Sequence, residues 1–212
     1  SAFSHCTNMT NINVDEKNMD YASDDGILLN KDQTEISCYP AGKSGEYIIP
    51  GHITDIDSYA FSGCSKLTGI TIPDSVTNIS IGAFSECIGL TSVTFGEKSR
   101  LLSIEGYAFY NCTGLKTVTV GEGITKINSY TFSTCTGLTQ VTLPTTLTEI
   151  SEGAFQGCTA LASIVLPDSV ATIGYRAFRN CTKLSEINYP MSWSSSGSDI
   201  FAGCSSLTKI EI

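Results

Sequence analysis

The sequence predicts a repeat solenoid of the α/β type, in which each unit of 23 residues supplies one parallel strand. Seven of the nine cysteines recur at steps of 23 residues, apart from one step of 25 between Cys87 and Cys112. A phenylalanine stands three residues before each of these cysteines, a leucine three after, and a β-branched residue six after. The seven units that share this register are marked by Cys64, Cys87, Cys112, Cys135, Cys158, Cys181 and Cys204.

Each unit contains a strand, a turn and a second apolar pair. In one unit, Val118 and Val120 alternate with Thr117 and Thr119, which is the period of a strand buried on one face. Proline, or glycine in two units, follows the strand and ends its ladder, because proline donates no backbone hydrogen bond. One unit cannot bury its apolar side chains alone, so neighbouring units must stack over a shared core.

The start of the chain departs from this period. An eighth copy runs from Ala2 through Cys6 to Val14, and Cys6 lies 58 residues before Cys64, which is one period plus 35 residues. We assign the extra residues to an insertion after this first unit, over residues 15–46, in which segments 26–29 and 34–39 form a β-hairpin flap. The alternative is a loop that contacts a ligand. Residues 1–212 then form a single solenoid domain of eight units.

Residues 193–199 are a second irregularity, because they replace the usual apolar pair of the unit. We expect Trp193 to fill the place of that pair. The segment is then a looser loop near the end of the chain.

Two segments of the repeat carry a family resemblance. The sequences AFSGCSKLTGITIPDSVTNI (60–79) and AFQGCTALASIVLPDSVATI (154–173) resemble the leucine-rich repeats of the BspA-like surface proteins, and the resemblance extends over nearly the whole chain. It implies a leucine-rich-repeat solenoid that is extracellular or on the cell surface. It also implies a role in adhesion to host proteins and cells, or in aggregation between bacteria. The family has no shared catalytic residue.

The framework cysteines are predicted to be buried free thiols. Stacked strands about 4.8 Å apart hold successive side chains parallel, whereas a disulfide needs Cβ atoms about 3.8 Å apart that face each other. No C-x-x-C pair occurs, so a metal site is not expected. Disulfides between units and a bound metal are the alternatives. Cys38, in the insertion, stands outside the framework and is the exception that could be exposed.

Charge and motifs exclude several classes of function. The chain has 21 acidic and 12 basic residues, for a net charge of −9, which disfavours nucleic acids and anionic membranes as partners. No apolar run approaches the roughly 18–20 residues of a membrane helix, so we expect no membrane insertion. His5 and His52 stand in variable or turn positions, and the common catalytic and nucleotide-binding motifs do not occur. We therefore expect no enzyme activity and no cofactor.

The outward positions of the strands are the candidate ligand-binding surface. They carry rows of small, mostly uncharged side chains, and those near the middle of the array are Thr94, Thr117, Thr119, Gln140 and Thr142. These residues suit a broad, shallow site for a host extracellular protein or glycan, or for another cell-surface protein. The alternative is that threonine stands there only for strand propensity and solubility.

These observations favour a monomeric, non-catalytic adhesion or protein-interaction module. The second possibility is an accessory repeat region of a larger multidomain surface protein or enzyme. An ice-binding array is disfavoured, because the curvature of a leucine-rich-repeat solenoid would prevent a flat match to a lattice.

Overall fold

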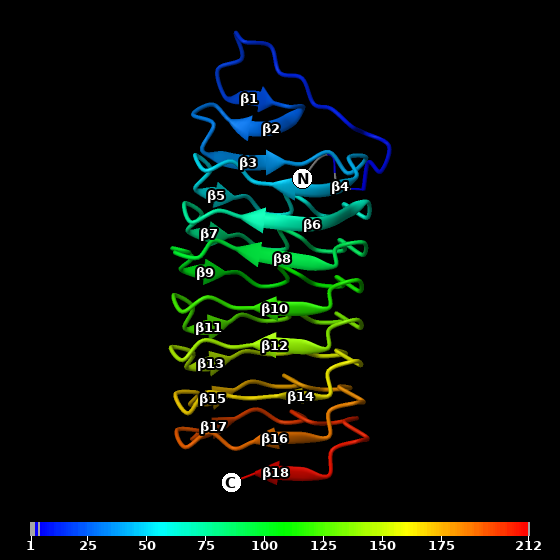
Figure 1. Cartoon of the computed structure of the whole chain (residues 1–212), viewed down its shortest axis with the longest axis vertical. Coiled ribbons are helices and arrows are strands. Elements are labelled where there is room, and N and C mark those ends of the chain that lie inside the picture. The colour runs from blue at the N-terminus through cyan, green and yellow to red at the C-terminus, as the bar shows by residue number, and fades with distance from the viewer. Residues whose placement is uncertain (1–2, 4, 212) are drawn as a thin grey trace.

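The chain winds into an elongated stack of rungs that runs from β1 at one end to β18 at the other (Figure 1). The structure is a computed structural model and describes residues 3 and 5–211. The predicted solenoid is confirmed. The described residues contain no helix, so strands and turns alone form each unit.

The first side of the stack, which we call the strand face, is built from the strands that follow each framework leucine. Neighbouring strands pair in parallel and in the register that the repeat predicts, as in Val118 opposite Val141 and Ile187 opposite Ile210. Inward residues such as Val118 are buried, whereas outward threonines are exposed. The strands are β4 (Gly45–Ile48), β6 (Leu67–Ile72), β8 (Ser92–Phe95), β10 (Thr117–Thr119), β12 (Gln140–Thr142), β14 (Ser163–Ile164), β16 (Glu186–Asn188) and β18 (Lys209–Glu211).

The second side, which we call the back face, comes from the apolar pair after each turn. Its strands are shorter and also pair in parallel, as in Ile56 opposite Ile79. The strands are β3 (Glu35–Cys38), β5 (Asp55–Ile56), β7 (Asn78–Ile79), β9 (Ser103–Ile104), β11 (Lys126–Ile127), β13 (Glu149–Ile150), β15 (Thr172–Ile173) and β17 (Ser195–Ser196). The apolar pair was expected from the sequence, and the structure shows that it forms a second ladder.

The third side, which we call the turn side, carries the phenylalanine and the cysteine of each unit. The amide of Phe132 donates to the carbonyl of Ala154 in the next unit, at 2.9 Å, and the amides of Phe61, Phe84, Phe109, Phe155 and Phe178 make the equivalent bond. The rings stack through the core: Phe132 lies 5.5 Å from both Phe109 and Phe155, measured between ring centroids. Backbone hydrogen bonds therefore link units on all three sides, although the strand-face ladder is interrupted between β12 and β14 and the back-face ladder between β9 and β11.

The predicted buried thiols are confirmed. Cys87, Cys112, Cys135, Cys158 and Cys181 are free cysteines with fully buried side chains. Each thiol also donates a hydrogen bond to the carbonyl of the phenylalanine one unit earlier, as from Cys135 Sγ to Phe109 O at 3.1 Å. The thiol thus satisfies a backbone acceptor as well as filling space, a role that the spacing alone does not show.

The predicted rung at Cys6–Val14 is wrong. Ala2 lies outside the described residues, Cys6 is exposed, and residues 9–14 form no strand. The first strand of the strand face is instead β4, which pairs in parallel with β6. Tyr39 takes the place of the phenylalanine in this unit: its ring stacks on Phe61 at 4.8 Å, and its carbonyl accepts a hydrogen bond from the Cys64 thiol.

The hairpin predicted within the insertion forms. Strand β2 (Ile27–Asn30) pairs antiparallel with β3, and β1 (Tyr21–Asp24) adds a further antiparallel strand outside β2. Strand β3 then pairs in parallel with β5, so the hairpin joins the back face directly. Cys38 is not the exception that the sequence left open, because it is only 4% exposed. The antiparallel strands cover the first end of the core.

Trp193 fills the place of the missing apolar pair, as predicted. It is partly buried against the core, and its ring stacks on Tyr189 with 4.6 Å between ring centroids. The expectation of a looser loop at 193–199 is wrong, because Ser195 and Ser196 form β17 and pair in parallel with β15.

The junction of hairpin and stack brings three carboxylates together. Burial, and then the charges of Asp57 and Asp55, raise the pKa of Glu35 above its ordinary value. A carboxylate with a raised pKa destabilises the fold when ionised, and this penalty disappears as the pH falls through the folded-state pKa. We therefore expect Glu35→Gln to raise the free energy of unfolding at pH 7 by less than about 1 kcal/mol, because Glu35 remains partly solvated.

Urea unfolding at pH 7 and pH 3 checks this expectation. The increase in the free energy of unfolding caused by Glu35→Gln should vanish at pH 3, where the carboxyl group of Glu35 is protonated in both the folded and the unfolded state. The exposed Glu16→Gln is the matched control and should change little at either pH. A loss of stability at pH 7 would contradict the expectation.

Candidate binding face

The five residues predicted as a binding surface lie on three neighbouring strands. Thr94 is on β8, Thr117 and Thr119 are on β10, and Gln140 and Thr142 are on β12. Thr117 lies opposite Gln140, and Thr119 lies opposite Thr142, so the outward positions form two straight rows. All five residues are exposed.

These five side chains have no hydrogen bond to any other residue that the structure describes. Threonines just before the same strands behave differently: Thr91 Oγ1 donates to Thr68 O at 2.9 Å, and Thr139 Oγ1 donates to Lys116 O at 3.0 Å. Hydroxyl groups outside the rows therefore bind the backbone of the preceding unit. Those within the rows remain available to solvent or to a partner.

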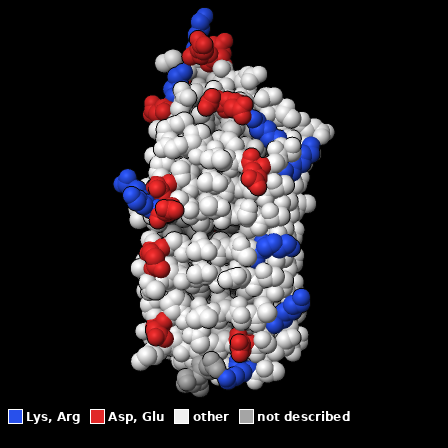
Figure 2. Space-filling view, in the orientation of Figure 1, with Lys and Arg blue, Asp and Glu red and all other residues white. Residues whose placement is uncertain are grey.

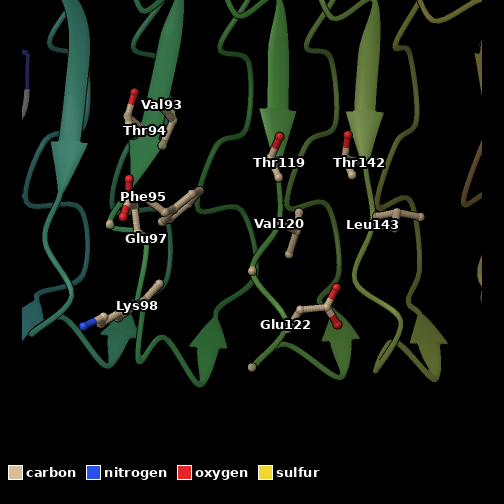
Figure 3. Close-up of a pocket in the computed structure, with 14 residues that line it drawn as sticks. Val93, Thr94, Phe95, Glu97, Lys98, Thr119, Val120, Glu122, Thr142 and Leu143 are labelled. Carbon is tan, nitrogen blue, oxygen red and sulfur yellow. The ribbon is translucent and has the colours of Figure 1, made fainter.

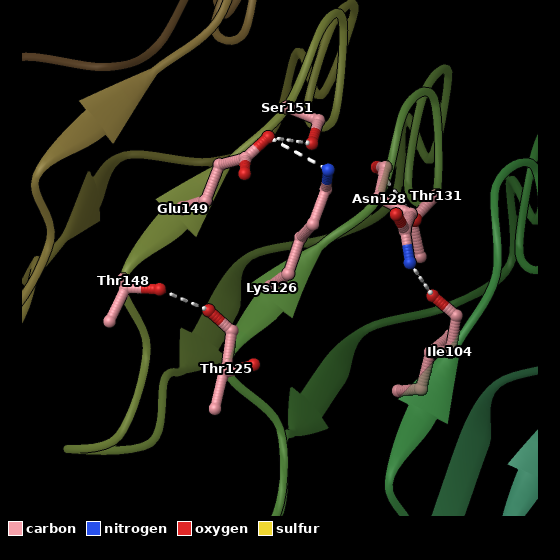
Figure 4. A network of polar contacts seen from close by, with 8 residues as sticks. All are labelled: Ile104, Thr125, Lys126, Asn128, Thr131, Thr148, Glu149 and Ser151. Carbon is pink, nitrogen blue, oxygen red and sulfur yellow. Dashed lines mark hydrogen bonds and ion pairs between the residues drawn. The ribbon is translucent and has the colours of Figure 1, made fainter. Parts of the chain in front are cut away.

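The back face, by contrast, uses its polar side chains internally (Figure 4). Thr148 Oγ1 donates to Thr125 O at 3.1 Å, and Lys126 Nζ lies 2.9 Å from Glu149 Oε1. Burial opposes ionisation of Glu149, but hydrogen bonds from Lys126 and Ser151 outweigh it and hold the pKa of Glu149 below its ordinary value. The back face therefore offers fewer unpaired polar groups than the strand face.

A hollow of about 660 Å³ opens where strands β8, β10 and β12 end. Thr94, Thr119 and Thr142 line one side of it, and the charged residues of the following turns line the other (Figure 3). Thr117 and Gln140 lie outside this hollow. The lining residues that the sequence did not single out include Val93, Phe95, Leu143, Glu97, Lys98 and Glu122.

The hollow coincides with the two units in which glycine replaces the proline after the strand. At Gly96, a side chain would collide with the carboxylate of Asp74, which accepts a hydrogen bond from the amide of Lys98 at 2.9 Å. The turn that contains Gly96 belongs to the unit with 25 residues in place of 23. These two signals were present in the sequence and mark the units at which the hollow lies, but they do not give the path of the turns that shape it.

Charge is distributed unevenly around the strand face. The surface over its central strands is mostly uncharged, and acidic and basic groups gather along its two sides (Figure 2). Lys116 precedes β10, and Glu122 follows it. Two exposed apolar residues lie in the same row as Thr119: Ile48 is 71% exposed and Val165 is 76% exposed. The face therefore combines neutral hydroxyls, isolated apolar side chains and charged margins.

A second hollow of about 850 Å³ lies at the inserted hairpin, where Tyr21, Leu28, Asp20, Glu35 and Asp57 contribute to its lining. It corresponds to the alternative in which the insertion contacts a ligand. Among the residues that the structure describes, no group of three or more His, Cys, Asp or Glu side chains could hold a metal ion. Within the same residues, no helix has the length and apolarity needed to cross a membrane.

Parallel strands, framework leucines and a stacked core define the chain as a leucine-rich-repeat solenoid. The model of the BspA type leucine rich repeat region matches residues 37–159 and 125–212, with six copies. The chain belongs to this family. Leucine-rich-repeat proteins of this kind are generally non-catalytic protein-interaction folds. No curated protein matches the chain.

Solved structures agree with this family. A T. pallidum leucine rich repeat protein is 27% identical, with a TM-score of 0.75 over 93% of this chain and 92% of that one. A leucine-rich repeat protein from Eubacterium ventriosum is 26% identical, with a TM-score of 0.68 over 84% of this chain and 54% of that one. A leucine rich cell surface protein from Faecalibacterium prausnitzii, at 24% identity and a TM-score of 0.59 over 93% and 78% of the two chains, shows the fold alone.

Proposed function

We propose that this protein is a non-catalytic adhesion or protein-interaction module, extracellular or on the cell surface, whose strand face binds a host extracellular protein or glycan or another cell-surface protein. The observation that carries the proposal is the pair of rows formed by Thr94, Thr117, Thr119, Gln140 and Thr142, whose side chains are exposed and unpaired among the described residues. The protein acts as a monomeric, single solenoid domain in this proposal.

The form of the strand face supports a broad and shallow contact. Small side chains allow a partner to approach the strands closely, and in the central units β10 and β12 each row offers one polar side chain per unit at a regular spacing. Specific interfaces of standard size bury about 800 Å² on each partner, so several neighbouring rungs must contribute. Because the chain carries a net charge of −9, the proposal favours neutral or basic partners over acidic ones.

Paired arginine substitutions test which face binds. We expect Thr119→Arg with Thr142→Arg to weaken binding to a host matrix protein or glycan, identified on an immobilised panel, by at least about tenfold, because two bulky charges then occupy the centre of the contact. The matched control is Thr125→Arg with Thr148→Arg, which places the same change in two neighbouring units next to β11 and β13 of the back face. Surface plasmon resonance measures both affinities.

All four threonines are exposed, so the strand-face pair should leave the unfolding free energy within about 0.5 kcal/mol of the parent. The back-face pair also loses the hydrogen bond from Thr148 Oγ1 to Thr125 O, so it should stay within about 1.5 kcal/mol. If binding survives the first pair and is lost with the second, the strand face is not the binding surface. If both pairs bind as the parent does, the hollow at the inserted hairpin becomes the surface to test.

A further inference from the structure

The turn side carries a row of tyrosines at strained backbone positions, which we call the tyrosine edge. The residue two before each framework phenylalanine has a positive φ: 59° at Tyr59, 60° at Tyr107 and 57° at Tyr130, against 61° at Gly82 and 58° at Gly153. This left-handed region is disfavoured for bulky residues and readily adopted by glycine. Glycine therefore meets the backbone requirement at two of these positions, and the tyrosine rings are not needed for it.

The rings lie along the outside of the turn side. Tyr59 and Tyr107 are 41% and 42% exposed. Tyr107 stacks on Tyr130, with 5.0 Å between ring centroids and planes 18° apart, and the Tyr130 hydroxyl donates to Glu152 Oε1 at 2.5 Å. The ring of Tyr59 occupies the space that a side chain at residue 82 would need. The edge is thus a fixed line of aromatic surface that is partly open to solvent.

The charge along the part of this edge that holds Tyr59 and Tyr107 is negative. The five turn segments 57–63, 80–87, 105–112, 128–135 and 151–158 contain Asp57, Glu86, Glu105 and Glu152, and they contain no Lys, Arg or His. The face of an aromatic ring attracts a cation within about 6 Å of its centroid, and nearby carboxylates add to that attraction. Aromatic rings and carboxylates together therefore form a surface that favours cations over anions or neutral groups.

The unit marked by Cys181 contains a contact of this kind, between a cation and a tyrosine ring, within the molecule itself. The guanidinium of Arg176 lies over the ring of Tyr175, 4.3 Å from its centroid, and Arg176 Nε lies 3.8 Å from Asp199 Oδ2. A tyrosine ring on this side of the stack thus already holds an arginine beside a carboxylate. Tyr59 and Tyr107 are partly exposed, Asp57 and Glu105 stand two residues before them in the sequence, and the segments that contain them have no arginine of their own.

We propose that the tyrosine edge binds an arginine-bearing segment of a protein partner, as a second interaction surface besides the strand face. Arginine suits the edge better than lysine, because its planar guanidinium both stacks on a ring and pairs with a carboxylate. Tyr59 and Tyr107 are two units apart, or about 10 Å along the stack at roughly 4.8 Å per rung. In a polyproline II segment, residues three apart share one face and lie about 9 Å apart, so arginine at every third position matches the two rings.

The test uses fluorescein-labelled peptides in which Arg-Pro-Pro, Lys-Pro-Pro or Glu-Pro-Pro is repeated four times, titrated with the full chain and followed by fluorescence anisotropy. The test variant is Tyr59→Gly with Tyr107→Gly, which gives both positions the residue found at Gly82 and Gly153. We expect the arginine peptide to bind the parent chain, and the variant to bind it about 5- to 30-fold more weakly, since two cation–π contacts are lost. The control is Tyr21→Gly, which removes an exposed tyrosine of β1, 46% exposed, outside the edge.

Binding of the lysine and glutamate peptides separates stacking on the tyrosine rings from attraction by the overall negative charge of the chain. The lysine peptide should bind more weakly than the arginine peptide, and the glutamate peptide should not bind. If the Tyr59→Gly and Tyr107→Gly variant binds the arginine peptide as tightly as the parent, the attraction is only the overall negative charge and the proposal is wrong. It is also wrong if a neutral oligosaccharide binds the edge and the arginine peptide does not.

Discussion

Replacing Phe132 by alanine is expected to lower the free energy of unfolding by about 3–5 kcal/mol. Phe132 is fully buried and stacks on a phenylalanine in the unit on either side, with interplanar angles of 6° and 10°. Its removal leaves a cavity in the middle of the ring column, and the hydrogen-bonded ladders of the three sides limit how far the units can collapse into it. Urea unfolding followed by circular dichroism measures the loss.

Phe201→Ala is the matched control for this substitution. Phe201 belongs to the same column but is only partly buried, and it stacks on one phenylalanine, Phe178, at 5.8 Å, with the Trp193 ring edge-on at 6.4 Å. We expect the control to cost less than half as much as Phe132→Ala, because less apolar area is lost and the cavity opens to solvent. Equal losses at the two positions would show that the ring column does not act as a continuous core.

The second large effect concerns thiol reactivity. Cys87, Cys112, Cys135, Cys158 and Cys181 should react with a thiol reagent at least about 1,000-fold more slowly in the native protein than in denaturant, because exposing a core residue requires opening that costs about 5 kcal/mol or more. Burial also raises the pKa of Cys135 to about 12, so few thiolates form at neutral pH. Intact mass measured over the course of labelling counts the modified cysteines.

Two other cysteines provide internal controls for the labelling. Cys6 is exposed and should react first. Cys204, on the last described rung, is only partly buried, so it should react next. Rapid modification of all five buried thiols in the native protein, or a mass that shows disulfides between rungs, would contradict the packing described above.

The thiol hydrogen bonds change what is expected of Cys135→Ser. The sequence alone predicts a cost of about 1–3 kcal/mol for burying a hydroxyl among apolar neighbours. In the structure, the side chain at this position has an acceptor, the carbonyl of Phe109 at 3.1 Å. We therefore expect Cys135→Ser to cost less than Cys135→Ala, because only serine can still donate to that carbonyl. Urea unfolding of the two variants compares them, and a larger loss in the serine variant would contradict this role.

Most of the fold could be predicted because the inward positions are strictly periodic. The register of Ile70 with Val93, and of Val118 with Val141, follows directly from the alignment of the framework cysteines. The first rung could not be found in this way. It uses Tyr39 in place of phenylalanine, and Gly42 stands three residues later in place of cysteine, so an alignment on cysteines passes over it. The copy around Cys6 matched the cysteine pattern but does not form the predicted strand.

The candidate binding face could also be predicted only in part. The two rows could be predicted because outward positions follow from inward ones by simple alternation. The position and shape of the hollow beside the rows could not be predicted, since they depend on the path of the turns after β8 and β10. The exposed ends of Glu97 and Glu122 are set by that path and not by the repeat. The 25-residue spacing marks the right unit but does not say which way its turn bends.

A photo-crosslink gives the most direct test of the strand face as the binding surface. Benzoylphenylalanine replaces Thr119 in one variant and Thr148 in another, and each variant is irradiated with a partner identified on the panel of host matrix proteins. We predict a crosslinked product, detected by mass spectrometry, from position 119 on the strand face and none from position 148 next to the back-face strand β13. A crosslink from position 148, with none from position 119, would contradict the proposed binding surface.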